Sequence, residues 1–327
     1  MKKILFFTLG LLSLTSCYED YVSDYDWTGV YFAKQHNVRT VVVGEDMAIE
    51  VGVVMSGVLS NDKNHNVGYR INDELATADG SIDGFVKHQD AFVRNYFTSG
   101  GVTEITPMPR DWYSCAYDNT ITIPKGDHLG RMRVEFDAEK FLNAPKDTRL
   151  PYYVLPLEVT DPGSIDKIVE GMSTTLIGIR YENMLFGNYW HGGISEVRDF
   201  DGTVLSQEKY YTTIPQAENR VYNLTTVGVN SLETNKIGPD AGSLKITLNE
   251  DKTITVSKSS KSDIDIIDEG SRYNDAKLLQ DRKLYLKYKY SNGDGTSTHV
   301  TDTLTFRNRT RDGVNEWRSE DPDDYNK

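Results

Sequence analysis

Short runs in which apolar and polar residues alternate fill much of this 327-residue chain. In residues 47–55, Ile49, Val51 and Val53 fall on one face of an extended segment. A period of two predicts a β-strand with one buried face. Similar runs recur along the chain with Gly, Asn and Asp between them, and one stretch, residues 90–97, has a helical pattern. The sequence therefore predicts an all-β protein.

The first half of the chain predicts a β-sandwich. Runs rich in branched and aromatic residues occupy residues 30–32, 38–43, 47–55, 112–116, 120–123, 131–136 and 152–160. Turn-forming residues separate several of them, at 44–46 and at 124–127. Many short strands joined by turns are typical of an immunoglobulin-like β-sandwich, which we place at residues 27–182.

The second half, residues 183–327, predicts an antiparallel meander. Eight strand candidates follow one another, starting near Tyr189, Val204, Arg220, Leu244, Thr253, Ile264, Leu284 and His299. Several links between them have the composition of hairpins. Eight sequential strands favour a lipocalin-like barrel, because closure removes exposed sheet edges. An open meander or a second sandwich is the alternative, since the links at 237–242 and 270–281 are not hairpins.

The N-terminus has the pattern of a lipoprotein signal peptide. Lys2 and Lys3 precede an apolar stretch of about 11 residues, which suits a signal peptide but is too short to span a membrane. Residues 14–17, Leu-Thr-Ser-Cys, resemble the bacterial lipobox. We therefore expect a signal peptide at residues 1–16, a lipid on Cys17, and an acidic tether at residues 17–26. An ordinary secretory signal with a chance cysteine is the alternative.

Glu19 and Asp20 lie directly behind this cysteine. An acidic pair at this place resembles the surface-export signal of Bacteroidota lipoproteins. It predicts an outer-membrane protein that faces the cell exterior, held on the membrane through its N-terminal lipid.

Charge limits the partners that the chain can bind, and cysteine content limits what can stabilise its fold. The chain has 36 basic and 49 acidic residues, a formal net charge of −13, and no basic run. Nucleic acid is therefore not an expected partner, because its phosphates need Lys and Arg. With Cys17 lipidated, Cys115 has no intramolecular partner, so the fold cannot depend on a disulfide.

No catalytic or metal-binding signature stands out. The six histidines have no pair at ligand spacing, and no nucleophile elbow or phosphate-binding glycine loop is present. Asp199 and Asp201 flank a glycine turn, where Asp is expected to make local hydrogen bonds. We therefore expect no metal, no cofactor and no enzymatic activity.

Two aromatic clusters are candidates for glycan binding. Trp112 and Tyr113 follow a proline-containing stretch, and Tyr189, Trp190 and His191 precede two glycines. Exposed rings near loops stack on the apolar faces of sugars. Alternation along a strand could put one ring of the second cluster inside and one outside. Packing of the same rings in the core is the structural alternative.

Several segments resemble a Bacteroides surface-lipoprotein family of polysaccharide-utilisation loci. Its N-terminal domain of unknown function, numbered seventeen-thirty-five, is similar to residues 30–32, 35, 38–41, 44–45, 49–58, 108–113, 123–126 and 153–157. Its usual C-terminal partner domain is similar to residues 187–193 and 302–307. The resemblance implies a cell-surface glycan-binding lipoprotein that helps to capture a glycan ligand for an outer-membrane importer complex.

Two other functions stay open at this point. One is a structural or adhesive surface lipoprotein, such as a fimbrial-type subunit or an assembly partner. The other is a glycosidase, although the chain has no room for the catalytic barrel of about 250 residues that follows related N-terminal domains.

Overall fold

The structure is a computed structural model that describes residues 25–87, 89–115, 119–210 and 219–319. The signal peptide, Cys17, Glu19 and Asp20 lie outside these residues, so those expectations stay predictions. The chain forms two compact units. Unit 1 contains the described residues up to Arg39, together with Ala48–Lys146 and Leu150–Ile179; unit 2 contains Thr40–Met47, Asp147–Arg149 and the residues from Arg180 onward. No helix in the described residues is long and apolar enough to cross a membrane.

One sheet of unit 1 is built from strands with the expected alternation. Its order is β10 (Lys167–Ile168), β1 (Gly29–Tyr31), β3 (Ala48–Ser56), β8 (Leu129–Phe136) and β6 (Tyr113–Cys115). In β3, Ile49, Val51 and Val53 are buried and the residues between them are more exposed. Burial of one face stabilises the strand by roughly 1.5–3 kcal/mol for each large apolar side chain.

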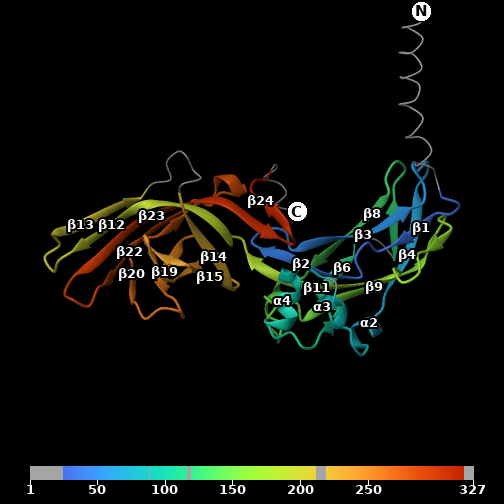
Figure 1. Ribbon diagram of the computed structural model, residues 1–327, viewed down its shortest axis with the longest axis horizontal. Helices are drawn as coiled ribbons and strands as arrows, with labels where there is room; N and C mark the ends of the chain where they lie inside the picture. The colour runs from blue at the N-terminus through green and yellow to red at the C-terminus, as the bar shows by residue number, and fades with distance from the viewer. Residues whose placement is uncertain (1–24, 88, 116–118, 211–218, 320–327) are drawn as a thin grey trace, which may run out of the picture. The chain divides into compact units, whose positions relative to one another are not determined.

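The second sheet has the order β2 (His36–Val43), β11 (Thr174–Asn183), β9 (Tyr153–Asp161), β4 (His65–Ile71) and β7 (Thr120–Ile123), and β5 (Thr106–Pro107) pairs with β9. Helices α3 (Asp83–Lys87) and α4 (Ala91–Thr98) bring Phe85 and Phe97 against Val154 of this sheet (Figure 1). The Asp90 carboxylate accepts from the Val93 amide at 2.9 Å and caps α4, which confirms the expected helix. Two further short helices are α2 (Glu74–Thr77) and α5 (Ala138–Leu142).

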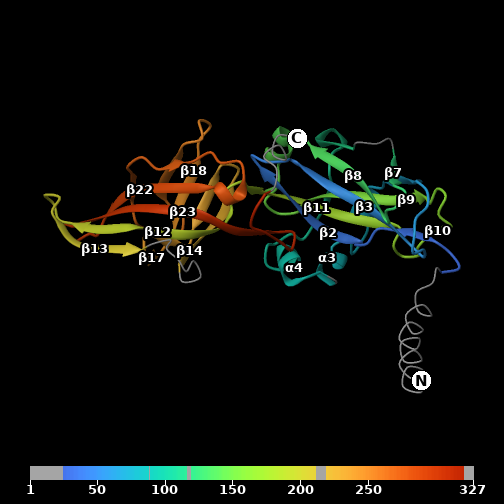
Figure 2. The same cartoon turned by 90° about the horizontal axis from the view of Figure 1, so that it is seen from above.

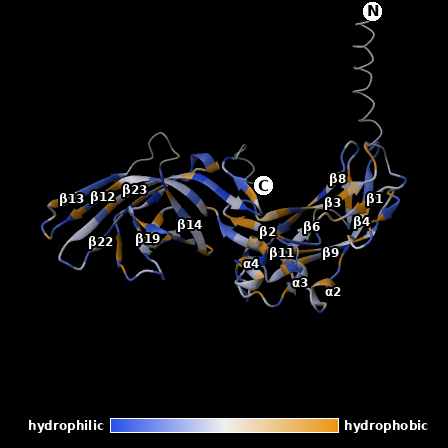
Figure 3. Cartoon of the chain, viewed as in Figure 1, coloured by the Kyte–Doolittle hydropathy of each residue, from blue (hydrophilic) through white to orange (hydrophobic). Residues whose placement is uncertain are grey.

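Unit 1 is mostly β, with two curled, half-barrel sheets and four short helices in its described residues, so the predicted all-β class holds in this coarser form. Hydrophilic and hydrophobic residues alternate along the strands of both units (Figure 3). An immunoglobulin-like arrangement of the strands, and a domain boundary at residues 182 and 183, stay predictions.

Unit 2 is a nearly closed antiparallel barrel. Its eight-strand path is β19 (Ile254–Lys258), β18 (Leu244–Leu248), β15 (Ser231–Thr234), β14 (Arg220–Gly228), β12 (Gly187–Arg198), β23 (Ser297–Arg311), β22 (Lys283–Ser291) and β20 (Ile266–Asp268). The long strands β12, β23 and β22 lie side by side (Figure 2). Three strands pair outside this path: β13 (Val204–Tyr210), β21 (Arg272–Tyr273) and β24 (Val314–Glu316). A short two-stranded sheet joins β16 (Lys236–Ile237) to β17 (Asp240–Ala241).

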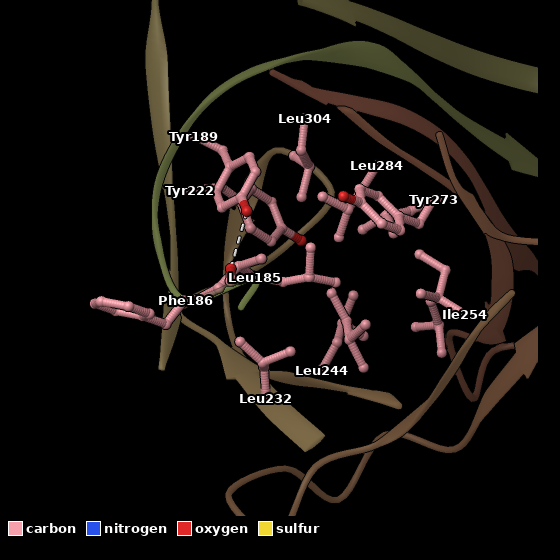
Figure 4. Packing of buried hydrophobic residues seen from close by; sticks show 14 of the residues in the cluster. Leu185, Phe186, Tyr189, Tyr222, Leu232, Leu244, Ile254, Tyr273, Leu284 and Leu304 are labelled. Carbon is pink, nitrogen blue, oxygen red and sulfur yellow. Dashed lines mark hydrogen bonds between the residues drawn. The ribbon is translucent and has the colours of Figure 1, made fainter. Parts of the chain in front are cut away.

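The gap in the barrel lies between its two end strands. An isolated bridge pairs Thr253 with Arg272, and the Val256 amide donates to the Asp268 carboxylate at 2.6 Å. The barrel interior is filled by buried apolar side chains contributed by most of the strands, including Leu232, Leu244, Ile254, Leu284 and Leu304 (Figure 4). Where these side chains meet, the inside of the barrel is a packed hydrophobic core.

All eight expected strand starts lie in or within two residues of a strand, but one barrel strand differs from the prediction. β13 pairs only with β12 among the described strands, and β15 takes its place in the barrel. Six of the seven residues of β13 are exposed, whereas three of the four residues of β15 are buried. The sequence Ser-Leu-Glu-Thr of β15 carries one large apolar residue, so hydrophobic patterning gave no signal for it.

Candidate functional site

The second aromatic cluster is divided by β12 between the inside and the outside of the barrel. Tyr189 is fully buried, and its hydroxyl donates to the Leu185 carbonyl oxygen at 2.9 Å (Figure 4). Its ring meets Phe306 edge to face, with centroids 5.5 Å apart. Burial raises the pKa of the Tyr189 phenol. Tyr189 therefore packs as a core residue, and its neighbour Trp190 faces outward.

His191 points inward with Tyr189 and belongs to a buried polar cluster. Its Nε2 lies 3.1 Å from Asp302 Oδ1, which also accepts from the Tyr210 hydroxyl at 2.6 Å. The rings of Tyr210 and Tyr222 lie 4.6 and 4.7 Å from the imidazole. His191 and Asp302 are both essentially inaccessible to solvent. The cluster connects β12, β13, β14 and β23 inside the barrel, away from the outer surface.

Trp190 lies on the outer face, where a β-bulge brings a cation to its ring. The pairing of β12 with β23 shifts between Asn188 and Tyr189, which lie opposite Asn308 and Phe306. Arg307 is the extra residue, so both Arg307 and Asn308 point outward. The Arg307 guanidinium carbon lies 4.6 Å from the centre of the Trp190 ring. Trp190 is half-buried and Arg307 is exposed, so the ring borders solvent beside a fixed cation.

A row of four asparagine side chains crosses the same face. The Asn223 amide donates to Asn188 at 3.1 Å, Asn188 donates to Asn308 at 3.4 Å, and Asn308 donates to Asn315 at 2.6 Å. The four residues come from β14, β12, β23 and β24 in turn. Side-chain amides aligned across neighbouring strands hold one another in place.

The row leaves hydrogen-bonding capacity free. A carboxamide has two N–H donors and an oxygen with two lone pairs. In the row, Asn188 and Asn308 each donate once and accept once through their side chains. Each therefore keeps one donor and one acceptor for a ligand. The aligned amides thus present a fixed set of donors and acceptors beside the Trp190 ring.

A second indole belongs to this surface. Trp317 directly follows β24 and is 57% exposed, with the Arg318 guanidinium carbon 4.8 Å from its ring centre. We include it in the surface because it follows Asn315 by two residues, the spacing at which side chains share a face of an extended segment. We call this surface the Trp–Asn face; it consists of Asn188, Trp190, Asn223, Arg307, Asn308, Asn315 and Trp317.

The first aromatic cluster lies in unit 1, where its indole contacts another ring. Trp112 ends the 3₁₀ turn η2 (Arg110–Trp112), and its ring lies 4.9 Å from that of Tyr153. The Tyr113 hydroxyl accepts from Arg110 at 3.0 Å, and burial raises the pKa of Tyr113. Both rings are half-buried. Trp112 thus has a ring partner within unit 1, whereas Trp190 has a guanidinium group and a row of amides beside it.

The remaining candidate groups have local roles. The Asp199 carboxylate accepts from the amides of Asp201 and Thr203 at 3.2 and 2.9 Å, which confirms its expected role in the turn. Cys115 is a free, half-buried thiol in β6, and burial raises its pKa. Within the described residues, no three His, Cys, Asp or Glu side chains are grouped so that they could hold a metal ion.

The sequence offers Trp190 as a candidate for glycan binding, but it gives no indication of the asparagines beside it. Neighbours in the row are 7 to 120 positions apart in the chain, and each is an ordinary polar residue of its own strand. Only strand pairing brings them into one row. The position of Trp317 could not be predicted, because it follows a strand of only three residues, which is too short to show an alternating pattern.

Comparison with known proteins supports the fold more than the function. A family model described as a "-like, N-terminal domain" matches residues 23–166. These residues include all the segments that carry the family resemblance of the first half. A search of the curated proteins found no match.

Among solved structures, a Bacteroides ovatus protein of unknown function is 19% identical, with a TM-score of 0.62 over 90% of this chain and 98% of that one. A Bacteroides ovatus multidomain protein including DUF1735 is 14% identical over 89% of this chain and 100% of that one, with a TM-score of 0.41. A Bacteroides ovatus protein provisionally described as carbohydrate-binding is 14% identical over 70% and 67% of the two chains, with a TM-score of 0.30. The last two scores are too low to carry an argument. The chain therefore has an N-terminal domain that matches this family model, and it shares its fold with a Bacteroides ovatus protein of unknown function.

Proposed function

We propose that this protein is a cell-surface glycan-binding lipoprotein and that the Trp–Asn face is its glycan-binding surface. The observation that carries the proposal is the hydrogen-bonded row of Asn223, Asn188, Asn308 and Asn315 beside the outward ring of Trp190. Indole rings offer an apolar plane for the face of a sugar ring, and fixed amides offer donors and acceptors for its hydroxyl groups. Both kinds of contact are present here on one side of one sheet.

The preformed geometry favours binding. The asparagines restrain one another, and Arg307 restrains Trp190, so less side-chain entropy is lost when a ligand binds. A half-buried indole that is freed from water by a ligand has the features of a binding hot spot. Neither a catalytic group nor a metal is needed for this role.

A glycan array with the soluble chain from residue 18 onward tests the proposal. Native protein is compared with a double variant, Asn188→Ala with Asn308→Ala, and with a matched control, Asn292→Ala, from the exposed hairpin between β22 and β23. We expect the double variant to lose the glycan signal and the control to keep it. Binding that is unchanged in the double variant would exclude the Trp–Asn face.

Membrane attachment is the second part of the proposal. The lipobox-like residues 14–17 support a lipid on Cys17, and Glu19 and Asp20 support export to the cell surface, where the protein would capture glycan for an outer-membrane importer. A lipid chain contributes about 0.8 kcal/mol for each buried methylene, so several chains give a durable anchor. Cys17→Ala should release the protein from the membrane fraction. Retention of this variant after an alkaline wash would contradict lipid anchoring.

One observation favours a structural or adhesive role as the second candidate. Among the described strands, β13 pairs only with β12, and all its residues except Tyr210 are exposed. Such an edge is open to an added strand from another protein. If the edge serves assembly, replacing Ser206 with Pro should abolish self-association of the purified protein and leave glycan binding intact.

A further inference from the structure

A hollow of about 520 Å³ lies further along the outer face of unit 2. Ile194, Glu196 and Arg198 line it from β12, in the same alternation that places Trp190 outside. The other lining residues come from β22, β23 and the end of β20: Glu269, Lys287, His299, Val300 and Thr301. Most of these side chains are polar or charged, so the hollow suits a hydrophilic ligand.

Both carboxylates of the hollow already have cationic partners. Glu196 accepts from Arg198 Nη2 at 2.5 Å and from Gln207 at 2.6 Å. Glu269 lies 2.9 Å from the ammonium nitrogen of Lys289 and 3.6 Å from His299 Nδ1. The hydrogen bond from Arg198 lowers the pKa of Glu196, and the one from Lys289 lowers the pKa of Glu269. Both groups are ionised at neutral pH, and their charges are matched by these neighbours.

Lys287 is the cation that remains. No carboxylate of the described residues lies within 4.0 Å of its ammonium group, and Glu269 acts on it only over a longer distance. Lys287 is exposed and lies directly opposite Thr301, an exposed residue that lines the same hollow. The hollow therefore has one uncompensated positive charge beside a hydroxyl group.

We infer that this hollow binds a single anionic substituent, a carboxylate or a sulfate, carried by an otherwise neutral glycan. Lys287 supplies the opposite charge, and the Thr301 hydroxyl can donate to the anion. Glu196 and Glu269 also line the hollow, so their carboxylates would repel a second anionic group of the ligand. The net charge of −13 also opposes a polyanion. This inference rests on the proposed function and specifies the class of glycan.

The ligand spans more than one sugar under this inference. Trp190 and Glu196 are six positions apart on β12, which is about 20 Å at roughly 3.3 Å per residue. A glycan that reaches both regions is therefore an oligosaccharide, with its neutral part at the Trp–Asn face and its acidic branch at Lys287.

Calorimetric titrations with matched probes test this inference. One pair of probes is a xylo-oligosaccharide bearing one glucuronic acid and the same compound after reduction of its carboxyl group. A second pair is a singly sulfated galacto-oligosaccharide and its desulfated form, which separates the two sources of negative charge. The proteins are the native chain, Lys287→Gln, and the control Lys125→Gln, which alters an exposed lysine of a turn in unit 1.

We expect the acidic member of one pair to bind with at least about tenfold higher affinity than its neutral form. A hydrogen bond to a charged group contributes about 1.5–3 kcal/mol, which corresponds to a tenfold or larger change in affinity. Lys287→Gln should remove the difference, Lys125→Gln should keep it, and added salt should reduce it. Equal binding of acidic and neutral probes, or no effect of Lys287→Gln, would overturn the inference while leaving the proposed function in place. If no probe binds, the inference is wrong for these glycan classes. If the glycan array is then positive with neutral glycans, the proposed function still stands and only the inference about the acidic group fails.

Discussion

Arg307 lies over the indole of Trp190, with its guanidinium carbon 4.6 Å from the ring centre. This contact depends on the bulge in β23, because Arg307 is the residue that has no partner in β12. The bulge also turns Asn308 outward. One irregularity in strand pairing thus creates both the fixed indole and the asparagine row, which together form the Trp–Asn face.

The buried polar cluster should stabilise the barrel through Tyr210. Tyr210→Phe removes the hydroxyl that donates to Asp302 at 2.6 Å and leaves that carboxyl group with less compensation. The expected loss is about 1–3 kcal/mol, measured by denaturant unfolding. Tyr285→Phe is the control, because that ring lies on the outer face beneath Arg272 and should lose less than about 0.5 kcal/mol. Equal stability of the two variants would show that the Tyr210 hydroxyl contributes nothing.

A buried ion cluster of unit 2 centres on Glu45. Its carboxylate accepts from two nitrogens of Arg309 at 2.8 and 2.7 Å and from Arg282 at 2.7 Å, and all three side chains are at most 5% exposed. Glu45→Gln takes the shared carboxylate away from two buried guanidinium groups, while Arg309 keeps its pair with Glu316. We therefore expect a loss of about 3 kcal/mol, the lower end of the range for breaking a buried ion pair.

Thermal unfolding measures this effect. Glu50→Gln is the control, since Glu50 and Arg131 form an exposed pair 3.8 Å apart that contributes less than about 1 kcal/mol. A melting temperature of Glu45→Gln that matches that of Glu50→Gln would contradict the assigned role of the cluster.

Glu233 should make the barrel sensitive to acid. Burial alone would raise its pKa, but Lys261, Ser260 and Ser259 donate to it and hold the pKa at about 2. Because the folded pKa lies below the ordinary value of 4.5, the group stabilises the fold above pH 4.5, and this contribution is lost as the pH falls toward 2. A fall of the pKa from 4.5 to about 2 corresponds to about 3 kcal/mol.

Glu233→Gln removes the titrating group. At pH 7 this variant should be less stable than the native protein, and the difference should shrink between pH 4.5 and pH 2. Melting temperatures of both proteins across this range provide the measurement. A difference that stays constant with pH would mean that Glu233 does not titrate as described.

The strands could be predicted from the sequence, whereas the site could be predicted only in part. Alternation along residues 187–193 predicts opposite faces for Tyr189 and Trp190, and the structure has Tyr189 inside and Trp190 outside. A strict period of two from Phe306, however, would put Asn308 inside the barrel. The bulge at Arg307 shifts the alternation by one residue, so Asn308 points outward, and no local sequence pattern predicts the bulge.

The same limit explains why β15 was missed and β13 was placed in the barrel. Val204 and Leu205 give β13 an apolar start, yet both are exposed, at 45% and 57%. In β15, Glu233 and Thr234 are buried because Ser259, Ser260 and Lys261 compensate the carboxylate and the Thr234 hydroxyl donates to the Lys236 carbonyl oxygen. Hydrogen-bond partners that come from distant strands are not visible in a hydrophobic pattern.

The most direct test of the proposed glycan surface is to measure both affinity and stability for Trp190→Ala, using a glycan found on the array. We predict an affinity at least tenfold lower, because a buried aromatic anchor typically contributes about 2 kcal/mol or more, with a melting temperature close to that of the native protein. Trp112→Ala should show the reverse: its ring packs against Tyr153, so the melting temperature should fall while affinity is kept. Undiminished glycan affinity in a folded Trp190→Ala variant would contradict the central claim that the Trp–Asn face binds glycan.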